Sequence, residues 1–195
     1  MTPMRDTPTY SADELAALGF ASCGRDVRIS RRASFHGAAR IHLGHHVRID
    51  DFVVLSAGAG GIHIGDYVHI AVHGSLIGAG RITVGDFANL SSRVAVYSSS
   101  DDYSGESMTN PMVPTEFTGV THADVHIGRH AIIGTGSVVL PGADLEEGVA
   151  VGALSLVRDR CTAFGIYAGT PARRIRERSR NLLALEQQLR AREVE

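Results

Sequence analysis

The sequence has no tryptophan, no lysine and only two cysteines, Cys23 and Cys161, in 195 residues. Two cysteines so far apart do not build a disulfide framework, so we expect free thiols, as in a reducing cytoplasm. No run of about eighteen apolar residues occurs, and we therefore expect no membrane span. Residues 1–8 are polar and lack the apolar stretch of a signal peptide, which also favours a cytoplasmic location.

The charges are nearly balanced, with 19 basic residues, 21 acidic residues and a formal net charge of −2. A chain without a basic excess is not expected to bind nucleic acid or an anionic membrane surface. The hydrophobic content of 44% is ordinary for a globular protein and permits a sizeable core. These numbers together predict one domain with small appendages.

An apolar residue returns at every sixth position through most of the chain. A period of six is neither the 3.6 of an α-helix nor the alternation of a strand, and it is typical of hexapeptide repeats that coil into a parallel β-helix. The clearest run is Ile127, Ile133, Val139, Leu145, Val151 and Val157, and a shorter run is Ile64, Ile70 and Leu76.

The sequence divides into three parts around this repeat. Residues 1–26 are predicted to form a helical cap, in which Ser11 and Glu14 occupy the positions of a capping box. Residues 27–171 are predicted to form the β-helix, whose end strands need cover against edge pairing. Residues 172–195 carry leucines at helical spacing and are predicted to form an amphipathic helix.

The period lapses between Val96 and Val125, and residues 97–124 are predicted to leave the β-helix as a long loop. Loops of this length inside compact domains are usually functional or disordered. Aromatic residues, methionines and prolines argue against simple disorder here. We therefore interpret residues 97–124, called the excursion loop below, as a protruding binding loop.

The repeats, the position of this loop and the stretch Ala168–Arg173 together resemble the hexapeptide-repeat acyltransferase superfamily. The likeness is strongest to its maltose, galactoside and polysaccharide O-acetyltransferase branch. The resemblance implies a left-handed β-helix, a homotrimer with active sites between subunits, and acetyl-CoA as the acyl donor, with no metal required.

Small and polar residues, one coil apart, are candidates to line a groove for the donor, although small residues also simply form β-helix corners. The resemblance implies that main-chain amides near Thr135 and Ala153 contact the pantetheine and thioester. Arginine suits a phosphate through its fork of N–H donors. Arg173 and Arg174 are therefore candidates to bind the 3′-phosphate of the donor, and the alternative is that they form a solvated turn. The expected donor-binding residues are Gly134, Thr135, Ala153, Ser155, Ala168, Gly169, Thr170, Arg173 and Arg174.

The acceptor side departs from the family pattern. Asp101 stands where the family normally has a catalytic histidine, and a carboxylate of ordinary pKa is a weak base for a hydroxyl. Asp102 would raise the pKa of Asp101 through like-charge repulsion, or both aspartates would bind an acceptor sugar or hold the loop. Tyr103 and Met108 are expected to shape the acceptor pocket. Asp101 is thus our first candidate for catalysis.

Three histidines are alternative acid–base candidates. His69 and His73 are expected on the β-helix surface, and His122 lies in the loop itself. The resemblance implies that His69 is close to where the family places acceptor-binding residues. Each of the three is otherwise an ordinary surface histidine.

We expect an acyltransferase acting on a sugar hydroxyl in polysaccharide or glycan synthesis. The missing loop histidine raises the alternative of N-acylation of a nucleotide-linked amino sugar, because a neutral amine needs no strong base. Two further alternatives are a zinc hydratase of the γ-carbonic-anhydrase type, with His42, His63 and His126 in one column, and a non-catalytic β-helix scaffold. Neither cysteine is expected to be an activated nucleophile.

Overall fold

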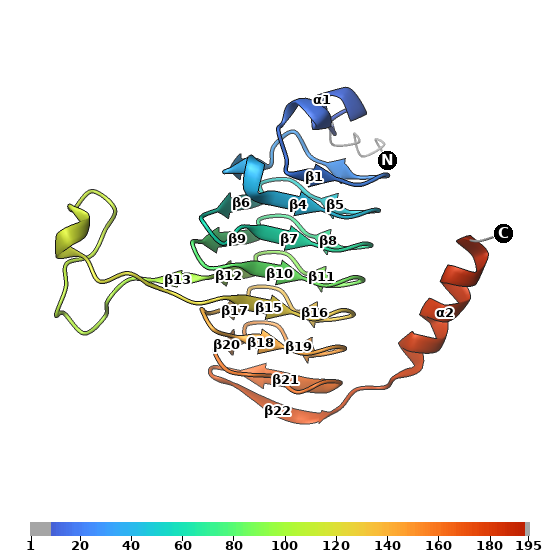
Figure 1. The fold of residues 1–195 in the computed structure, drawn as a ribbon. Coiled ribbons are helices and arrows are strands. Elements are labelled where there is room, and N and C mark those ends of the chain that lie inside the picture. Colours follow the sequence, from blue (N-terminus) through green and yellow to red (C-terminus); the bar gives the residue numbers. More distant parts are fainter. Residues whose placement is uncertain (1–8, 194–195) are drawn as a thin grey trace, which may run out of the picture.

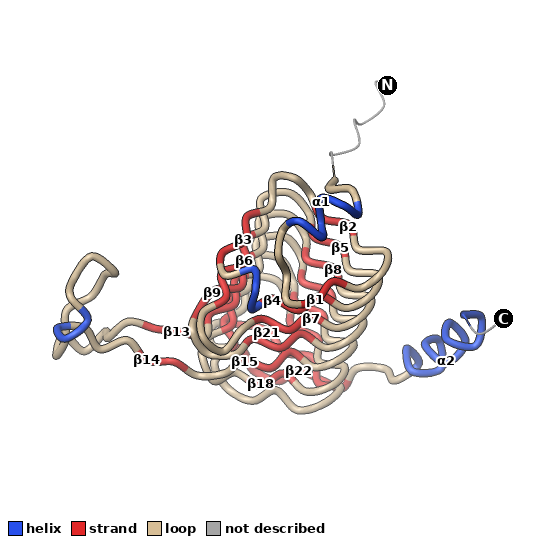
Figure 2. The backbone as a smooth tube through the Cα atoms, turned by 45° about the horizontal axis from the view of Figure 1, so that its top comes forward, coloured by secondary structure: helices blue, strands red, loops and turns tan. Residues whose placement is uncertain are grey.

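A computed structural model describes residues 9–193, which coil into a left-handed parallel β-helix with three flat sides (Figures 1 and 2). Residues 1–8, to which the signal-peptide expectation and part of the predicted cap belong, lie outside the described range, as do residues 194–195. The first sheet has the order β1-β4-β7-β10-β15-β18. Its strands are β1 Ser22–Cys23, β4 Ile41–Leu43, β7 Ile62–Ile64, β10 Ile82–Val84, β15 Val125–Ile127 and β18 Asp144–Leu145.

The second and third sheets complete the triangular cross-section. The second contains β2 Arg28–Ile29, β5 Arg48–Ile49, β8 His69–Ile70, β11 Asn89–Leu90, β16 Ile132–Ile133, β19 Ala150–Val151, β21 Gly165–Gly169 and β22 Ala172–Glu177. The third contains β3 Ser34–His36, β6 Val54–Ala57, β9 Ser75–Gly78, β12 Ala95–Tyr97, β17 Val138–Val139 and β20 Leu156–Val157. All of these strands pair in parallel except β21 and β22, which are antiparallel.

The six-residue period places one apolar side chain inside the coil on each side. Ile64, Ile70 and Leu76 are 4%, 0% and 0% exposed, as the repeat predicts. The register aligns like with like on successive coils, so that Leu55, Leu76 and Val96 stack along the third sheet. The core is therefore a continuous apolar column that every coil extends.

A column of rings runs along the corner between the first and second sheets. Tyr67, Phe87 and His130 there have φ of 58°, 60° and 57°, in the left-handed region that costs free energy for residues with a side chain. Their rings stack, with centroids 4.9 Å apart for Tyr67–Phe87 and for Phe87–His130. Stacking at such distances offsets part of the backbone cost.

The N-terminal end of the β-helix is covered by α1 Ala12–Ala17. Ser11 is its N-cap, and the side chains of Ser11 and Glu14 form the predicted capping box. Leu15 is 7% exposed and packs on the core. A 3₁₀ turn, η1 Ala38–Arg40, follows in the next coil.

The C-terminal segment differs from the prediction of one helix over residues 172–195. Residues 172–177 form β22, which pairs with β21 and covers the edge of the second sheet, and α2 Asn181–Glu193 follows. An open sheet edge needs hydrogen-bond partners, and this requirement outweighs the helical tendency of the segment. No helix of the described residues is long and apolar enough to span a bilayer.

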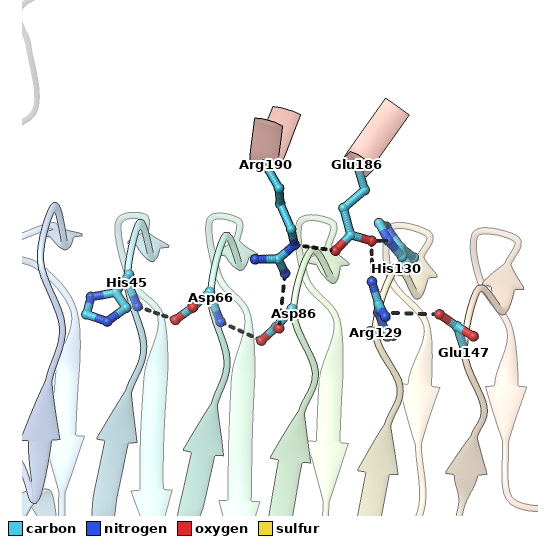
Figure 3. A network of polar contacts seen from close by, with 8 residues as sticks. All are labelled: His45, Asp66, Asp86, Arg129, His130, Glu147, Glu186 and Arg190. Carbon is cyan, nitrogen blue, oxygen red and sulfur yellow. Dashed lines mark hydrogen bonds and ion pairs between the residues drawn. The ribbon is translucent and has the colours of Figure 1, made fainter. Parts of the chain in front are cut away.

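A network of ion pairs holds α2 beside the ring column (Figure 3). The Glu186 carboxylate is 8% exposed and accepts hydrogen bonds from Arg129, from His130 Nε2 at 2.7 Å and from Arg190 Nε at 2.7 Å. Arg190 Nη2 also lies 3.8 Å from Asp86 Oδ2. Burial alone would raise the pKa of Glu186, but these hydrogen bonds and the charge of Arg129 lower it below the ordinary value.

The excursion loop stands away from the β-helix on the left of Figure 1. It leaves and returns as a two-stranded antiparallel ribbon of β13 Ser99–Ser100 and β14 Thr121–His122, and contains a 3₁₀ turn, η2 Thr115–Phe117. The predicted protrusion is confirmed.

Candidate active site

A cavity of about 940 Å³ lies between the excursion loop and the third sheet. Tyr97, Val138 and Leu140 line it from the β-helix, while Asp101 and His122 line it from the base of the loop. Its wall is thus mainly apolar, with one carboxylate and one imidazole at the neck of the loop. A mostly apolar cleft with a few polar groups is the usual form of a small-molecule site.

The structure brings two of the loop candidates to this cavity. Asp101 and Tyr103 line it, and within residues 9–193 the Asp101 carboxylate has no hydrogen-bond or ion-pair partner. Such a carboxylate is open to a donor or a cation supplied by a bound molecule.

Asp102 and Met108 do not line the cavity. Asp102 accepts hydrogen bonds from Ser104 Oγ, Ser104 N and Ser107 N at 2.7, 2.8 and 2.8 Å, and these bonds lower its pKa. Its carboxylate therefore organises the loop. Met108 pairs through its backbone with Thr118 and Phe117, and its side chain is 58% exposed.

His69 and His73 lie apart from this cavity. Both ring nitrogens of His69 are engaged, Nε2 with Asp50 Oδ2 at 2.8 Å and Nδ1 with Asn89 Oδ1 at 3.0 Å. Burial would raise the pKa of Asp50, but its bonds to His69 and Arg48 lower it. His73 stacks on Phe52 with ring centroids 5.0 Å apart. The structure therefore gives His69 and His73 structural contacts, and the acid–base roles of these histidines stay predictions.

The corner between the second and third sheets offers unpaired main-chain donors. Thr135 and Ala153 are exposed and sit on neighbouring coils, as the pairing of Ile133 with Val151 shows. Neither of their main-chain N–H groups has an acceptor within the described part of the chain. Two free amides one coil apart are able to bind the carbonyl oxygens of an extended ligand.

The remaining small residues of this corner hold it closely packed. A side chain at Gly134 would meet Ala153 N at 2.4 Å, so only glycine fits there. Ser155 is buried and accepts from Gly169 N at 3.2 Å while donating to Gly152 O at 2.8 Å. Ala168 and Gly169 end β21, and Thr170 lies in the turn to β22. Gly134 thus allows the close packing of neighbouring coils, and Ser155 uses its hydroxyl for hydrogen bonds within the fold.

A second cavity, of about 210 Å³, collects four arginines beside β20 and β22: Arg158, Arg160, Arg173 and Arg174. Three of them face carboxylates, Arg158 with Asp159, Arg160 with Glu146, and Arg174 with Glu177. Arg173 contacts only the main-chain oxygen of Ala172, at 3.2 Å, among the residues described. Of the four, Arg173 has the guanidinium most available to an added phosphate.

The two cavities adjoin neighbouring strands of one sheet. Val138 of β17 lines the larger and Val157 of β20 the smaller, and β17 pairs with β20. Sequence reasoning missed Tyr97, Leu140 and Pro141 on the larger cavity and Arg158 and Arg160 on the smaller. These residues carry no motif, and only the coil register brings them to the sites.

Neither cysteine is a nucleophile at these sites. Cys23 and Cys161 are free, as predicted. Burial raises the pKa of Cys161 to about 11, so its thiol stays protonated at neutral pH.

The histidine column of the hydratase alternative forms only in part. His42 and His63 stack on the first sheet with ring centroids 4.4 Å apart. Thr83 lies between His63 and His126 in the register, so the third histidine is separated from the pair. Within residues 9–193, no three histidine, cysteine or acidic side chains are placed to hold a metal ion.

Comparisons with known proteins agree with this geometry, although no family model matches the sequence. The chain is 54% identical over 173 residues to dTDP-4-amino-4,6-dideoxy-D-glucose acyltransferase of Escherichia coli, covering 89% of this chain and 90% of that protein. It superposes with a TM-score of 0.91 and 40% identity on AntD, an N-acyltransferase from Bacillus cereus, in complex with dTDP and 3-hydroxybutyryl-CoA. That match covers 96% of this chain and 98% of AntD. A maltose O-acetyltransferase from Clostridium difficile shares the fold alone, with a TM-score of 0.56 and 17% identity over 91% of this chain and 80% of that one.

The chain belongs to the hexapeptide-repeat acyltransferase superfamily, which confirms the resemblance. It is a CoA-dependent acyltransferase, and an acyl-CoA is its donor. The comparisons support an amine acceptor better than the sugar hydroxyl that the sequence analysis put first.

Proposed function

We propose that this chain transfers an acyl group from an acyl-CoA to the amino group of a dTDP-linked amino sugar. The observation that carries the proposal is the 54% identity, over nearly the whole chain, to an enzyme named for acylating dTDP-4-amino-4,6-dideoxy-D-glucose. AntD has also been solved with this sugar nucleotide and coenzyme A, in a serine-to-cysteine variant that matches with a TM-score of 0.90 and 39% identity over 95% of this chain and 98% of that one.

The two cavities suit the two substrates. The acceptor sugar occupies the cavity under the excursion loop, where Asp101 accepts a hydrogen bond from the amine and Tyr103 covers it. The donor extends along the corner, with Thr135 and Ala153 N–H groups on its carbonyl oxygens and Arg173 and Arg174 on a phosphate. Gly134, Ser155, Ala168, Gly169 and Thr170 shape this track.

The reaction is direct transfer. The neutral amine nitrogen attacks the thioester carbonyl carbon, the C–S bond breaks, and coenzyme A leaves as its thiol after the nitrogen gives up a proton. The main-chain donors stabilise the oxyanion that forms on the carbonyl oxygen. Asp101 acts mainly by orienting the amine, since catalysis by positioning needs no strong base.

We further propose a homotrimer, as the resemblance implies, and a cytoplasmic location, where acyl-CoA and sugar nucleotides are available. The exposed corner at Thr135 and Ala153 would then face a neighbouring subunit. Sedimentation of the free protein as three copies would agree with this assembly, and a monomer active at the same dilution would contradict it.

The test is a paired transfer assay. The purified chain is given acetyl-CoA with either dTDP-4-amino-4,6-dideoxyglucose or the matching sugar nucleotide that has a hydroxyl at position 4. Thiol release and product mass are measured. We expect the amine to be acylated far faster, and preferential acylation of the hydroxyl would overturn the proposal.

Thermal unfolding with ligands gives an independent check. A ligand at a hundredfold over its dissociation constant adds about 2.7 kcal/mol of stability. We expect stabilisation by acetyl-CoA and by dTDP. Stabilisation by acetyl-CoA without any response to dTDP would count against a dTDP-linked acceptor.

A further inference from the structure

The neck of the excursion loop pairs a serine with a histidine. Ser99 and His122 are directly opposite in the antiparallel ribbon of β13 and β14. Ser99 Oγ lies 2.8 Å from His122 Nδ1, and the main-chain N–H of Ala79, on the coil before, donates to the same Oγ at 2.7 Å. The hydroxyl therefore joins the β-helix to the imidazole.

This arrangement suits a tautomer of His122 in which Nδ1 accepts the proton of Ser99 Oγ. A serine hydroxyl carries a single proton, and a neutral imidazole has one donor and one acceptor nitrogen. Because Ala79 already donates to Ser99 Oγ, the oxygen has its own proton to give to His122 Nδ1. An imidazole whose Nδ1 accepts carries its proton on Nε2.

The residue His122 lies at the large cavity. His122 lines this cavity together with Tyr97 and Asp101. Within residues 9–193, His122 Nε2 makes no hydrogen bond or ion pair. The neck thus brings the His122 imidazole and the Asp101 carboxylate to the same space.

We propose that His122 is an acceptor-binding residue whose Nε2–H donates a hydrogen bond to an oxygen of the sugar nucleotide, and that it does not remove the proton from the amine. This inference rests on the proposed function for the nature of the acceptor. Sugar hydroxyls and phosphates supply oxygen acceptors, whereas the amine needs an acceptor for its own N–H, which Asp101 provides. Ser99 is the positioning residue that holds the imidazole in the donating form.

The first test compares two substitutions of His122. His122→Gln keeps an N–H donor at similar reach but has no basic nitrogen, and His122→Phe keeps a planar ring without any N–H. We expect His122→Gln to stay within about threefold of the wild-type kcat/KM for the sugar nucleotide. We expect His122→Phe to lose roughly 10- to 100-fold, mostly through KM for the sugar nucleotide, with KM for acyl-CoA unchanged.

The pH profile separates a donor from a base. A neutral or a protonated imidazole both donate from Nε2, so the wild type and His122→Gln are expected to share one profile. If His122 were the base, both variants would lose kcat to a similar extent. The limb of the pH–rate profile that reports the titration of His122 would also disappear. Either that result or a fully active His122→Phe would overturn the proposal.

Imidazole NMR tests the tautomer without any substrate. Long-range ¹H–¹⁵N spectra of the ¹⁵N-histidine protein, assigned with His122→Gln, should show His122 protonated at Nε2, and Ser99→Ala should change this signal. A resonance of the Nδ1–H form in the wild type would refute the inference. A wild type that acylates another acceptor would overturn only the proposed function, and the same two variants are then compared on that acceptor.

Discussion

At the scale of single residues, position relative to the coil register decides what each polar group does. Asp101 and Asp102 are adjacent in sequence, yet one lines the cavity and the other is bonded within the loop. His69 and His122 differ in the same way, because His69 has both nitrogens engaged by neighbouring coils. Residue type alone therefore does not separate site residues from structural ones.

The first prediction concerns the open carboxylate. Asp101→Asn keeps the size of the side chain but removes its charge, so the amine is oriented less well. We expect kcat to fall about 10-fold or more, because a hydrogen bond to a charged group is lost. The affinity for CoA should change little. Steady-state kinetics and calorimetry measure the two effects.

Glu106→Gln is the matched control, since Glu106 lies in the same loop and outside the cavity lining. An unchanged kcat for Asp101→Asn would remove the role proposed for this residue.

The second prediction concerns the arginine cavity. Arg173→Ala removes the guanidinium that has no carboxylate partner among the described residues, and so weakens binding of a phosphate. We expect KM to rise several-fold for acetyl-CoA and much less for acetyl-dephospho-CoA, because a charge-assisted hydrogen bond contributes about 1.5–3 kcal/mol. Kinetics with both donors checks this.

Arg158→Ala serves as the comparison, because Arg158 already pairs with Asp159 at 3.4 Å. Equal rises of KM for the two donors in Arg173→Ala would show that Arg173 does not bind the 3′-phosphate.

At the scale of elements, α2 depends on contacts that its own sequence does not contain. The helix is anchored by Glu186 to Arg129 and His130, more than fifty residues earlier, and Arg190 covers the ring of Phe87 at 5.2 Å. Its leucines face outward to a large extent, with Leu185 56% exposed. Ion pairs at the ring column therefore decide where α2 lies.

The third prediction concerns this anchor. Glu186→Ala leaves Arg129 and His130 without their shared carboxylate, and we expect α2 amides to exchange hydrogen roughly tenfold faster, which corresponds to about 1.4 kcal/mol. Gln188→Ala, on the exposed side of the same helix, is the control. Exchange of α2 that is equal in the two variants would contradict the anchor.

The anchor also predicts an acid dependence. The pKa of Glu186 is lowered in the folded protein, so its contribution is complete above the ordinary glutamate pKa of about 4.3 and is lost as pH falls through the lower folded value. Acid should therefore release α2 in the wild type. In Glu186→Gln, which lacks this carboxylate, the acid step due to Glu186 should be absent from the exchange data.

At the scale of the whole molecule, the β-helix behaves as a stack in which each coil contacts only its neighbours. Such a molecule has its stability distributed along one axis, and a defect in a central coil interrupts the apolar column. α1 covers the first coils, and at the other end β22 pairs with β21, the last strand of the coil in the second sheet.

The fourth prediction tests that column. Leu76→Ala empties space in the middle of the core, where Leu76 is 0% exposed, and should cost about 2–5 kcal/mol of unfolding free energy. Ser75→Ala, one residue earlier and facing outward, should change it by less than about 0.5 kcal/mol. Chemical denaturation compares the two, and similar costs would show that the inward column does not carry the stability.

The sequence by itself determined the coil. The six-residue period fixes which side chains face inward, and the pattern of Ser11 and Glu14 fixes the start of α1, because both are local and repeat or close within a few residues. The excursion loop was also predictable, since it is the place where the period stops. The class of enzyme followed from the same repeats and from the stretch Ala168–Arg173.

Only the tertiary structure decided the chemistry around the cavity and the path of the C-terminus. Residues 172–177 became a strand because β21 offered an unpaired edge, and Glu186 became an anchor because α2 reached the ring column. Ser99 Oγ links the ring of His122 to the main chain of Ala79, 43 residues earlier. Contacts of this kind join residues that no local pattern relates, so they exist only once the coils have stacked.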